Sequence, residues 1–294
     1  MSIPVKTLAS GFSMPVYGLG TWGMGGGWNV TDTSNDERNI AAIRYAIEKG
    51  VRHIDTAELY GGGHSEELIA QAAEGVDRSK LFITTKVLAG LEGGYDGILR
   101  ACEASLKRLG TDYLDMYLLH RSPGHSTAEI MQAMDRLVDE GVVRNIGVCN
   151  MTVHRFEETQ KLTKHKLVCN QVHYSLECRE AVDEGVLEYC QKNDVSVTAW
   201  GPLSRGLLKT AEILTEMATK YNKTPYQVAL NWLITQQNVI TISKTSSPEH
   251  LDENLGALDW ELSSSDWQRL SDEFPGQMAV SNRVPLSYEA EIEP

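Results

Sequence analysis

The sequence lacks the long apolar runs and the positive charge that would tie the protein to a membrane or to a nucleic acid. No run approaches the roughly 20 apolar residues of a membrane-spanning helix. Residues 1–18 have no continuous apolar core, so we expect no signal peptide. The 27 Lys and Arg residues are outnumbered by 40 Asp and Glu residues, which leaves a net charge of −13. This balance argues against polyanions as main partners, although a local basic pocket can still hold a small anion.

Cysteine is scarce, and its spacing does not indicate disulfide bonds or a metal site. The five residues form no C-x-x-C spacing and lie in apolar stretches: Cys102, Cys149, Cys169, Cys178 and Cys190. An odd number in this arrangement predicts buried free thiols in a reducing compartment. We therefore expect a cytoplasmic protein. We also expect a monomer with no bound metal ion.

The sequence also lacks a linker, a low-complexity segment or a charge block that would mark a domain boundary. With 41% hydrophobic and 23% charged residues, it has the composition of an ordinary globular chain. A length of 294 residues is within the range of one large barrel. We expect a single domain over residues 1–294.

Short β-branched or aliphatic runs recur along the chain. Most lie about 25–35 residues apart, the length of one βα unit. Eight of them predict an α/β fold, the (β/α)8 TIM barrel. The interval before the last run is longer and predicts additional helix, and further helices are expected at the C-terminal end. The eight runs are Val16–Leu19, Val51–Ile54, Leu81–Thr85, Tyr113–Leu119, Val143–Val148, Leu167–Val172, Val195–Ala199 and Val239–Ile242.

Helix-boundary residues separate these runs. Expected helix starts are the capping pairs Ser34 with Glu37 and Ser126 with Glu129, and the Thr224-Pro225 and Ser247-Pro248 dipeptides. Expected helix ends are Gly50, Gly110 and Gly141.

A doubly wound open sheet is the alternative fold, because it also alternates parallel strands with helices. That fold usually has G-x-G-x-x-G after its first strand. Here Gly18-Leu19-Gly20 is followed by Thr21-Trp22-Gly23, which does not match the spacing. The mismatch favours the barrel.

Four polar residues come at the ends of successive strand patterns. Asp55 follows the second run with Tyr60 in the loop after it, Lys86 follows the third run, and His120 follows the fourth. In a barrel, strand ends and the loops after them form one mouth, where reactive side chains gather. Each residue alone is ordinary, but their placement on three consecutive strands indicates a shared site.

Four segments resemble, in order and spacing, the signatures of the aldo-keto reductases, bacterial-type NADPH-dependent enzymes that reduce carbonyl groups. They are Gly50–Tyr60, Leu81–Lys86, Leu118–His120 and Ile242–Thr245. The similarity extends from about residue 14 to about residue 274.

The resemblance implies a catalytic tetrad of Asp55, Tyr60, Lys86 and His120. Carbonyl reduction needs hydride at carbon and a proton at oxygen, which Tyr60 would donate. Lys86 is expected to lower the pKa of that phenol from near 10, and Asp55 to hold Lys86 charged. His120 would orient the carbonyl oxygen.

The resemblance also implies a nicotinamide cofactor lying across the mouth. Asn150 and Gln171 would bind its carboxamide, and Trp200 would stack on its ring. Further expected contacts are Gly20, Thr21, Trp22 and Asp55, and the loop Gly201, Pro202, Leu203, Ser204, Arg205 and Gly206 over the pyrophosphate. Cys149 stands where the family commonly has serine.

The adenosine end is implied at Lys244, Thr245, Ser246, His250, Glu253 and Asn254. Lys244 and the two hydroxyls suit a 2′-phosphate, so NADPH is expected, with NADH as a second cofactor. Many relatives have arginine at the position of His250, and an imidazole offers no lasting charge near neutral pH.

The substrate is expected to be a small carbonyl compound held by Trp22, Met24, Tyr60, His120 and Arg121. Two other functions stay open. One is a nucleotide-sensing regulatory subunit that resembles the potassium-channel β subunits. The other is a Schiff-base aldolase that uses Lys86 as nucleophile.

Overall fold

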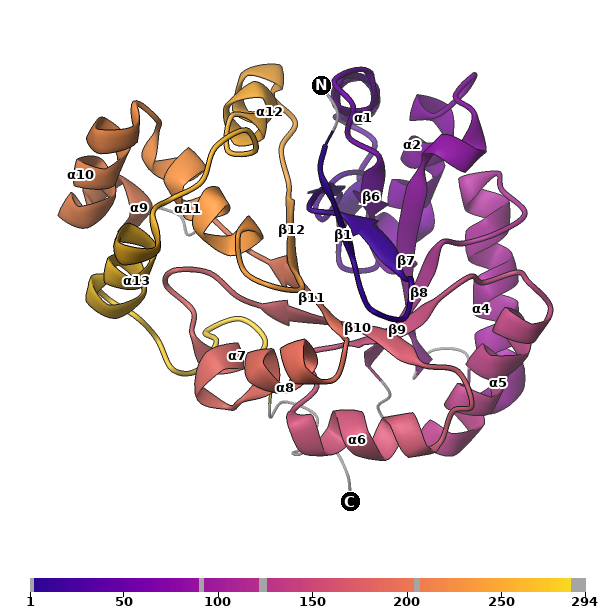
Figure 1. Ribbon diagram of the computed structural model, residues 1–294. Helices are drawn as coiled ribbons and strands as arrows, with labels where there is room; N and C mark the ends of the chain where they lie inside the picture. Colours follow the sequence, from indigo (N-terminus) through magenta and orange to yellow (C-terminus); the bar gives the residue numbers. More distant parts are fainter. Residues whose placement is uncertain (1–2, 90–92, 122–125, 204–206, 287–294) are drawn as a thin grey trace.

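Eight parallel strands close into a barrel in the computed structural model, which describes residues 3–89, 93–121, 126–203 and 207–286 (Figure 1). Around the barrel the strand order is β10-β11-β12-β3-β6-β7-β8-β9. This confirms the predicted (β/α)8 fold. The strands are β3 (Tyr17–Gly20), β6 (His53–Asp55), β7 (Phe82–Leu88), β8 (Met116–Arg121), β9 (Ile146–Cys149), β10 (Leu167–His173), β11 (Ser196–Trp200) and β12 (Val239–Ser243).

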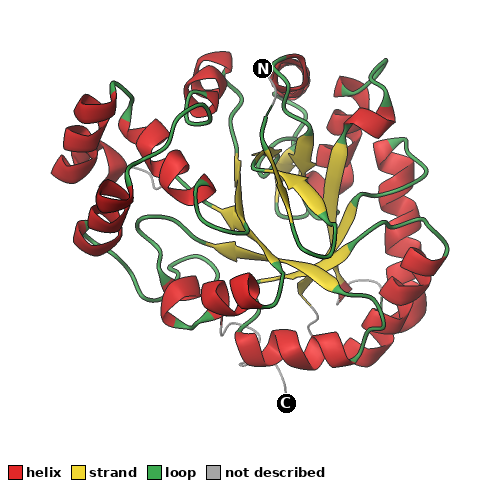
Figure 2. Ribbon diagram, viewed as in Figure 1, coloured by secondary structure: helices red, strands yellow, loops and turns green. Residues whose placement is uncertain are grey.

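Helices surround the barrel on the outside (Figure 2). The helices are α1 (Asp36–Glu48), α2 (His64–Ala72), α4 (Gly94–Leu109), α5 (Thr127–Asp139), α6 (Val153–Lys161), α7 (Glu180–Asp183), α8 (Val186–Lys192), α9 (Leu207–Thr210), α10 (Glu212–Tyr221), α11 (Pro225–Ile234), α12 (Pro248–Leu255) and α13 (Ser264–Glu273). The long interval before β12 holds α9, α10 and α11, and α13 follows the eighth βα unit, as expected. Within the described ranges, no helix is both long and apolar enough to cross a membrane.

The strands extend farther toward the mouth than the apolar runs indicate. Asp55, Lys86 and His120 were expected to follow their strands, but they lie within β6, β7 and β8. Strand pairing is a property of the backbone, so it continues past the apolar side chains as long as a neighbouring strand runs alongside. The correction places these three side chains on rigid strands instead of on loops.

Two of the expected helix caps are confirmed and two are not. Thr224 forms a full capping box with Gln227, and the Ser247 hydroxyl accepts from the backbone N–H of His250. Helix α1 instead has Asn35 at its N-cap without a side-chain bond, because the Ser34 hydroxyl accepts from Asn35 Nδ2 at 2.9 Å. Ser126 occupies the N-cap of α5 but makes no capping bond there.

An antiparallel hairpin of β1 (Val5–Thr7) and β2 (Ser13–Pro15) covers the N-terminal end of the barrel. Sequence periodicity did not predict it. Leu8, Phe12 and Met14 of this segment pack with buried barrel side chains in a separate apolar cluster. The turn is held by Asp194, whose carboxylate accepts from the backbone N–H groups of Ala9 at 2.5 Å and Ser10 at 2.9 Å.

We expect Asp194→Ala to loosen this hairpin and lower the free energy of unfolding by about 1–2 kcal/mol. Burial alone would raise the pKa of Asp194, but hydrogen bonds from Lys166, Ser10 and Ala9 lower it to about 2. The pKa is therefore depressed on folding, and the stabilisation is present above the unfolded pKa near 4 and lost as pH falls through about 2.

Urea unfolding at pH 7 and at pH 3 measures this effect. The difference between wild type and Asp194→Ala should shrink at the lower pH. Asp259, an exposed carboxylate, supplies the control substitution Asp259→Ala. A difference between wild type and Asp194→Ala that is the same at both pH values would contradict the assigned role.

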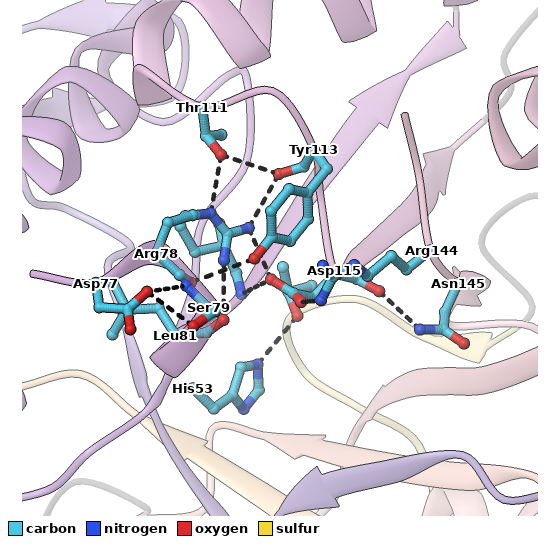
Figure 3. Close-up of polar contacts among 12 residues, drawn as sticks. His53, Asp77, Arg78, Ser79, Leu81, Thr111, Tyr113, Asp115, Arg144 and Asn145 are labelled. Carbon is cyan, nitrogen blue, oxygen red and sulfur yellow. Dashed lines mark hydrogen bonds and ion pairs between the residues drawn. The ribbon is translucent and has the colours of Figure 1, made fainter. Parts of the chain in front are cut away.

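A buried carboxylate, Asp115, is the centre of a group of polar contacts around the starts of β7, β8 and β9 (Figure 3). Asp115, just before β8, accepts from Arg78 Nη2 at 2.7 Å, from the backbone N–H of Ile83 at 3.0 Å and from Arg144 Nη1 at 3.2 Å. The two guanidinium groups also lie over the Tyr113 ring, at 4.1 and 3.7 Å from its centroid. Two guanidinium groups, from the segments just before β7 and β9, satisfy the buried carboxylate, so this cluster stabilises the barrel on which the mouth is built.

Candidate active site

Three side chains expected in the tetrad meet at the mouth around one ammonium group. Lys86 Nζ donates to Asp55 Oδ1 at 2.6 Å and to the carbonyl oxygen of Thr56 at 2.7 Å, and it lies 3.5 Å from Tyr60 Oη. Lys86 and Asp55 are each only 1% exposed. Adjacent parallel strands bring the two charges together, since β6 pairs with β7 along its whole length.

Tyr60 is held by a tight loop that folds against a second short hairpin, β4 (Gly26–Gly27) and β5 (Val30–Thr31). Gly61 follows it with φ +62°, and a Cβ there would lie 2.2 Å from the Gly25 carbonyl oxygen. Only glycine fits such a close backbone approach in the left-handed region. The loop therefore fixes where the phenol points.

The charges of this cluster are strongly coupled. Burial alone would lower the pKa of Lys86, but the charges of Asp55 and Tyr60 outweigh it and raise that pKa. For Tyr60 burial dominates and raises the pKa, while Lys86 acts in the opposite direction. Lys86 lowers the pKa of Tyr60, as expected. The expected net lowering of that pKa is wrong for the protein without ligand, because burial of the phenol raises the pKa by more than Lys86 lowers it.

His120 lies on β8 beside the tyrosine. Its ring centroid is 6.3 Å from that of Tyr60 and 5.3 Å from that of Trp28. Burial, followed by the charges of Lys86 and Arg121, holds the pKa of His120 well below its usual range. The buried Nδ1 atom finds no hydrogen-bond partner among the described residues. A neutral ring with an unsatisfied polar atom at the mouth is suited to bind a polar ligand atom.

A cavity of about 730 Å³ opens above these groups. Asp55, Tyr60 and His120 lie at its base, and Trp22, Trp28 and Trp200 are among its walls. Arg121 also lines it, with its guanidinium carbon 5.9 Å from the Trp28 ring centroid. Aromatic walls around a few polar groups are typical of a small-molecule site.

A second cavity, of about 660 Å³, adjoins the first. Gly23, Leu203 and Lys244 line both, so the two form a continuous, elongated hollow across the mouth. The residues expected to hold adenosine line this second cavity: Lys244, Thr245, Ser246, His250, Glu253 and Asn254. This shape suits an extended dinucleotide.

The residues expected around a nicotinamide line the first cavity. Gln171 donates to Asp55 Oδ2 at 2.7 Å, and Asn150 Oδ1 accepts from Trp200 Nε1 at 3.1 Å. The Trp200 ring also stacks on His173, with centroids 4.3 Å apart and planes 12° apart. Bonds and stacking thus hold the tryptophan plane fixed. Gly20, Gly201, Pro202 and Leu203 line the cavity as well, whereas Ser204, Arg205 and Gly206 lie outside the described residues.

Two expected contacts lie away from the cavity. Met24 is fully buried in the main apolar core, which corrects its assignment to the substrate wall. Thr21 is also fully buried, and its hydroxyl donates to the carbonyl oxygen of Asp55 at 3.1 Å. Burial removes both side chains from the cavity wall, and Thr21 instead contacts the backbone of Asp55.

Several lining residues were missed from the sequence. Trp28 lines the first cavity and forms an edge contact with Trp22, with ring centroids 5.8 Å apart. Its position in the sequence, directly after the glycine-rich segment that contains Trp22, could have indicated that it lines the same cavity. Arg283 and Val284 line the first cavity from the C-terminal segment. The Glu180 carboxylate holds that segment by accepting from the backbone N–H groups of Ser281 and Leu286. No local motif predicts that the C-terminal segment reaches this cavity.

A model of the aldo/keto reductase family matches residues 17–272. The chain belongs to the aldo/keto reductase family. Among the relatives of this aldo/keto reductase is a methylglyoxal reductase, YeaE, of Escherichia coli. The two are 38% identical over 270 residues, or 90% of this chain and 92% of the relative. A glyoxal reductase of Bacillus subtilis is 35% identical over 265 residues, with 90% of each chain covered.

Solved structures of other aldo-keto reductases share the fold of this one. The thermostable enzyme Tm1743 superposes with a TM-score of 0.86 and 40% identity, covering 92% of this chain and 99% of that one. An aldo-keto reductase of Klebsiella pneumoniae in complex with NADPH gives a TM-score of 0.82 at 34% identity, covering 95% of this chain and 98% of that one. This chain is accordingly an oxidoreductase of carbonyl compounds.

Proposed function

We propose that this aldo/keto reductase reduces aldehydes and ketones to alcohols with NADPH, and that Tyr60 donates the proton to the carbonyl oxygen. The observation that carries the assignment is the buried ammonium of Lys86, 3.5 Å from Tyr60 Oη and 2.6 Å from Asp55 Oδ1. A phenol next to a fixed positive charge can release its proton as the charge on the substrate oxygen develops.

Each member of the tetrad has one task in this mechanism. When bound, NADPH supplies the hydride that the carbonyl carbon receives. Tyr60 Oη gives its proton to the carbonyl oxygen, and the ammonium of Lys86 stabilises the phenolate that remains. Asp55 keeps Lys86 charged and in place. The neutral ring of His120 donates one hydrogen bond that orients the carbonyl oxygen toward Tyr60.

The cofactor residues follow from the two adjoining cavities. Asn150 and Gln171 would hold the carboxamide, and Trp200 would present its ring to the nicotinamide. The remaining contacts to the nicotinamide end are proposed at Gly20, Trp22, Gly201, Pro202 and Leu203, and those to the adenosine end at Lys244, Thr245, Ser246, His250, Glu253 and Asn254.

The ion pair argues against a Schiff-base aldolase. Such an enzyme needs a neutral amine as nucleophile. Asp55 and Tyr60 raise the pKa of Lys86 against the effect of burial, so the amine stays protonated. A regulatory nucleotide sensor is disfavoured for another reason: a binding role needs no buried ammonium between a carboxylate and a phenol.

The relatives and the cavity favour small aldehydes as substrates. Methylglyoxal and glyoxal reductases are among the relatives, and Trp22, Trp28 and Trp200 are among the residues that line the cavity. We further propose that the chain is a single domain that acts as a cytoplasmic monomer without nucleic-acid or membrane partners. The net charge of −13 supports the absence of polyanionic partners, and the burial of all five free cysteines supports a reducing compartment.

We expect the purified protein to consume NADPH in the presence of methylglyoxal or other short aldehydes, followed as loss of absorbance at the nicotinamide band. NADH should support a slower reaction at the same concentration. Borohydride treatment with the aldehyde but without cofactor should leave no adduct on Lys86. Tight binding of NADPH without turnover on any aldehyde would instead support the sensor role.

A further inference from the structure

The second cavity is lined by a positively charged side chain, Arg38, that lies outside the segment expected to hold adenosine. Arg38, on α1, lines this cavity together with Lys244, Ser246 and His250. Arg38 Nε donates to the carbonyl oxygen of Ser246 at 3.3 Å. The guanidinium therefore lies against the loop between β12 and α12.

The contact is part of a longer junction between α1 and α12. The Ser246 hydroxyl donates to Asn39 Oδ1 at 3.2 Å. Toward the C-terminal end of α1, Tyr45 Oη donates to Asp252 Oδ2 of α12 at 2.7 Å, and Nζ of Lys49, the residue just after α1, lies 2.8 Å from Asp252 Oδ1. Several contacts along one helix fix its position, so the backbone of Arg38 is already placed beside the cavity that its side chain lines.

Only one nitrogen of the Arg38 guanidinium donates a hydrogen bond within the described part of the chain. Among the described residues, none accepts a hydrogen bond from its two terminal nitrogens, since the contact with Ser246 uses Nε alone. The charged residues lining this cavity are Arg38, Lys244 and the carboxylate Glu253. His250 lines the cavity too, but its imidazole lacks the paired donor geometry of a guanidinium. A phosphate monoester carries nearly two negative charges, which a single lysine balances only in part.

We propose that Arg38 binds the 2′-phosphate of NADPH and determines the preference for NADPH over NADH, a role for which His250 lacks the paired donors. This inference rests on the proposed use of NADPH. The two terminal nitrogens of a guanidinium match two phosphate oxygens, which makes Arg38 a bidentate partner beside the point charge of Lys244. Because NADH has a hydroxyl in place of this phosphate, Arg38 contributes nothing comparable to its binding.

The test is calorimetric titration of wild type and Arg38→Gln with NADPH, NADH and adenosine 2′,5′-bisphosphate, without substrate. Arg38→Gln should weaken NADPH and the bisphosphate by about tenfold to a hundredfold and leave NADH unchanged. Arg44→Gln is the matched control, because Arg44 is exposed on the same helix but donates to the Gln71 carbonyl oxygen away from the cavity. It should titrate like wild type.

Placing a charge back in the cavity provides a second check. The double variant Arg38→Gln/His250→Arg should regain most of the lost NADPH affinity, while NADH again stays unchanged. Equal weakening of NADPH and NADH by Arg38→Gln, or no weakening of either, would overturn the assignment. Failure of the wild type itself to bind NADPH would contradict the proposed function, which is a different result from failure of this inference.

Discussion

Tyr60→Phe is expected to lower kcat for aldehyde reduction by about a hundredfold to ten-thousandfold, the usual contribution of a positioned proton donor. The substitution removes one oxygen atom and keeps the ring, whose centroid lies 4.9 Å from that of Trp22. Packing at the mouth should survive, so NADPH affinity should change little. Steady-state kinetics and a calorimetric titration of the same preparation separate the two effects.

The pH dependence gives Tyr60→Phe a sharper readout. Any residual rate in the variant should no longer follow the titration of a phenol at alkaline pH. Tyr113→Phe is the matched control, since that phenol lies at the far end of the barrel and donates a 3.4 Å bond to the Arg78 carbonyl oxygen (Figure 3). Parallel loss of NADPH binding and turnover in Tyr60→Phe would mean that the phenol is structural instead of the proton donor.

Lys86→Met should remove activity and also destabilise the fold. The change leaves Asp55 buried without its ammonium partner, and such a broken pair costs about 3–5 kcal/mol. Gln171 still donates to Asp55 at 2.7 Å, but one amide does not replace a positive charge. Burial already raises the pKa of Asp55 against the opposing effect of Lys86. Without Lys86 the carboxyl group is therefore expected to take up a proton.

The double variant Asp55→Asn/Lys86→Met distinguishes stability from catalysis. Removing both charges should recover much of the lost unfolding free energy, measured in urea, because no isolated charge stays buried. Activity should stay as low as in Lys86→Met, since Tyr60 still lacks its ammonium neighbour. A double variant that regained turnover would exclude a role for Lys86 in the chemistry.

Local sequence patterns were enough to predict the fold because barrel strands are short, buried and regularly spaced. Every one of the eight apolar runs became a barrel strand. Capping patterns were less reliable, and Ser34 shows why. A short hydroxyl side chain can bond to several neighbours, and the choice depends on backbone geometry that composition does not determine.

The cluster around Lys86 was predictable for a related reason. Asp55, Lys86 and His120 are on three neighbouring strands that the barrel arranges side by side, and Tyr60 is five residues from Asp55. Residues at matching ends of adjacent parallel strands must lie close together. Their electrostatics were not predictable in the same way, because the pKa of Tyr60 depends on how much water the finished mouth excludes.

By itself, then, the sequence determined the order of strands and helices and the set of polar residues at the mouth, since both depend on contacts between units that are consecutive in the chain. Tertiary structure alone decided that Met24 is buried, that Arg283 reaches the cavity from the C-terminal segment and that Arg38 and Lys244 line the same second cavity. Arg38 and Lys244 are more than two hundred residues apart. No periodicity or motif in the sequence predicts that two such residues lie close together, because their proximity arises only when the closed barrel brings α1 against α12.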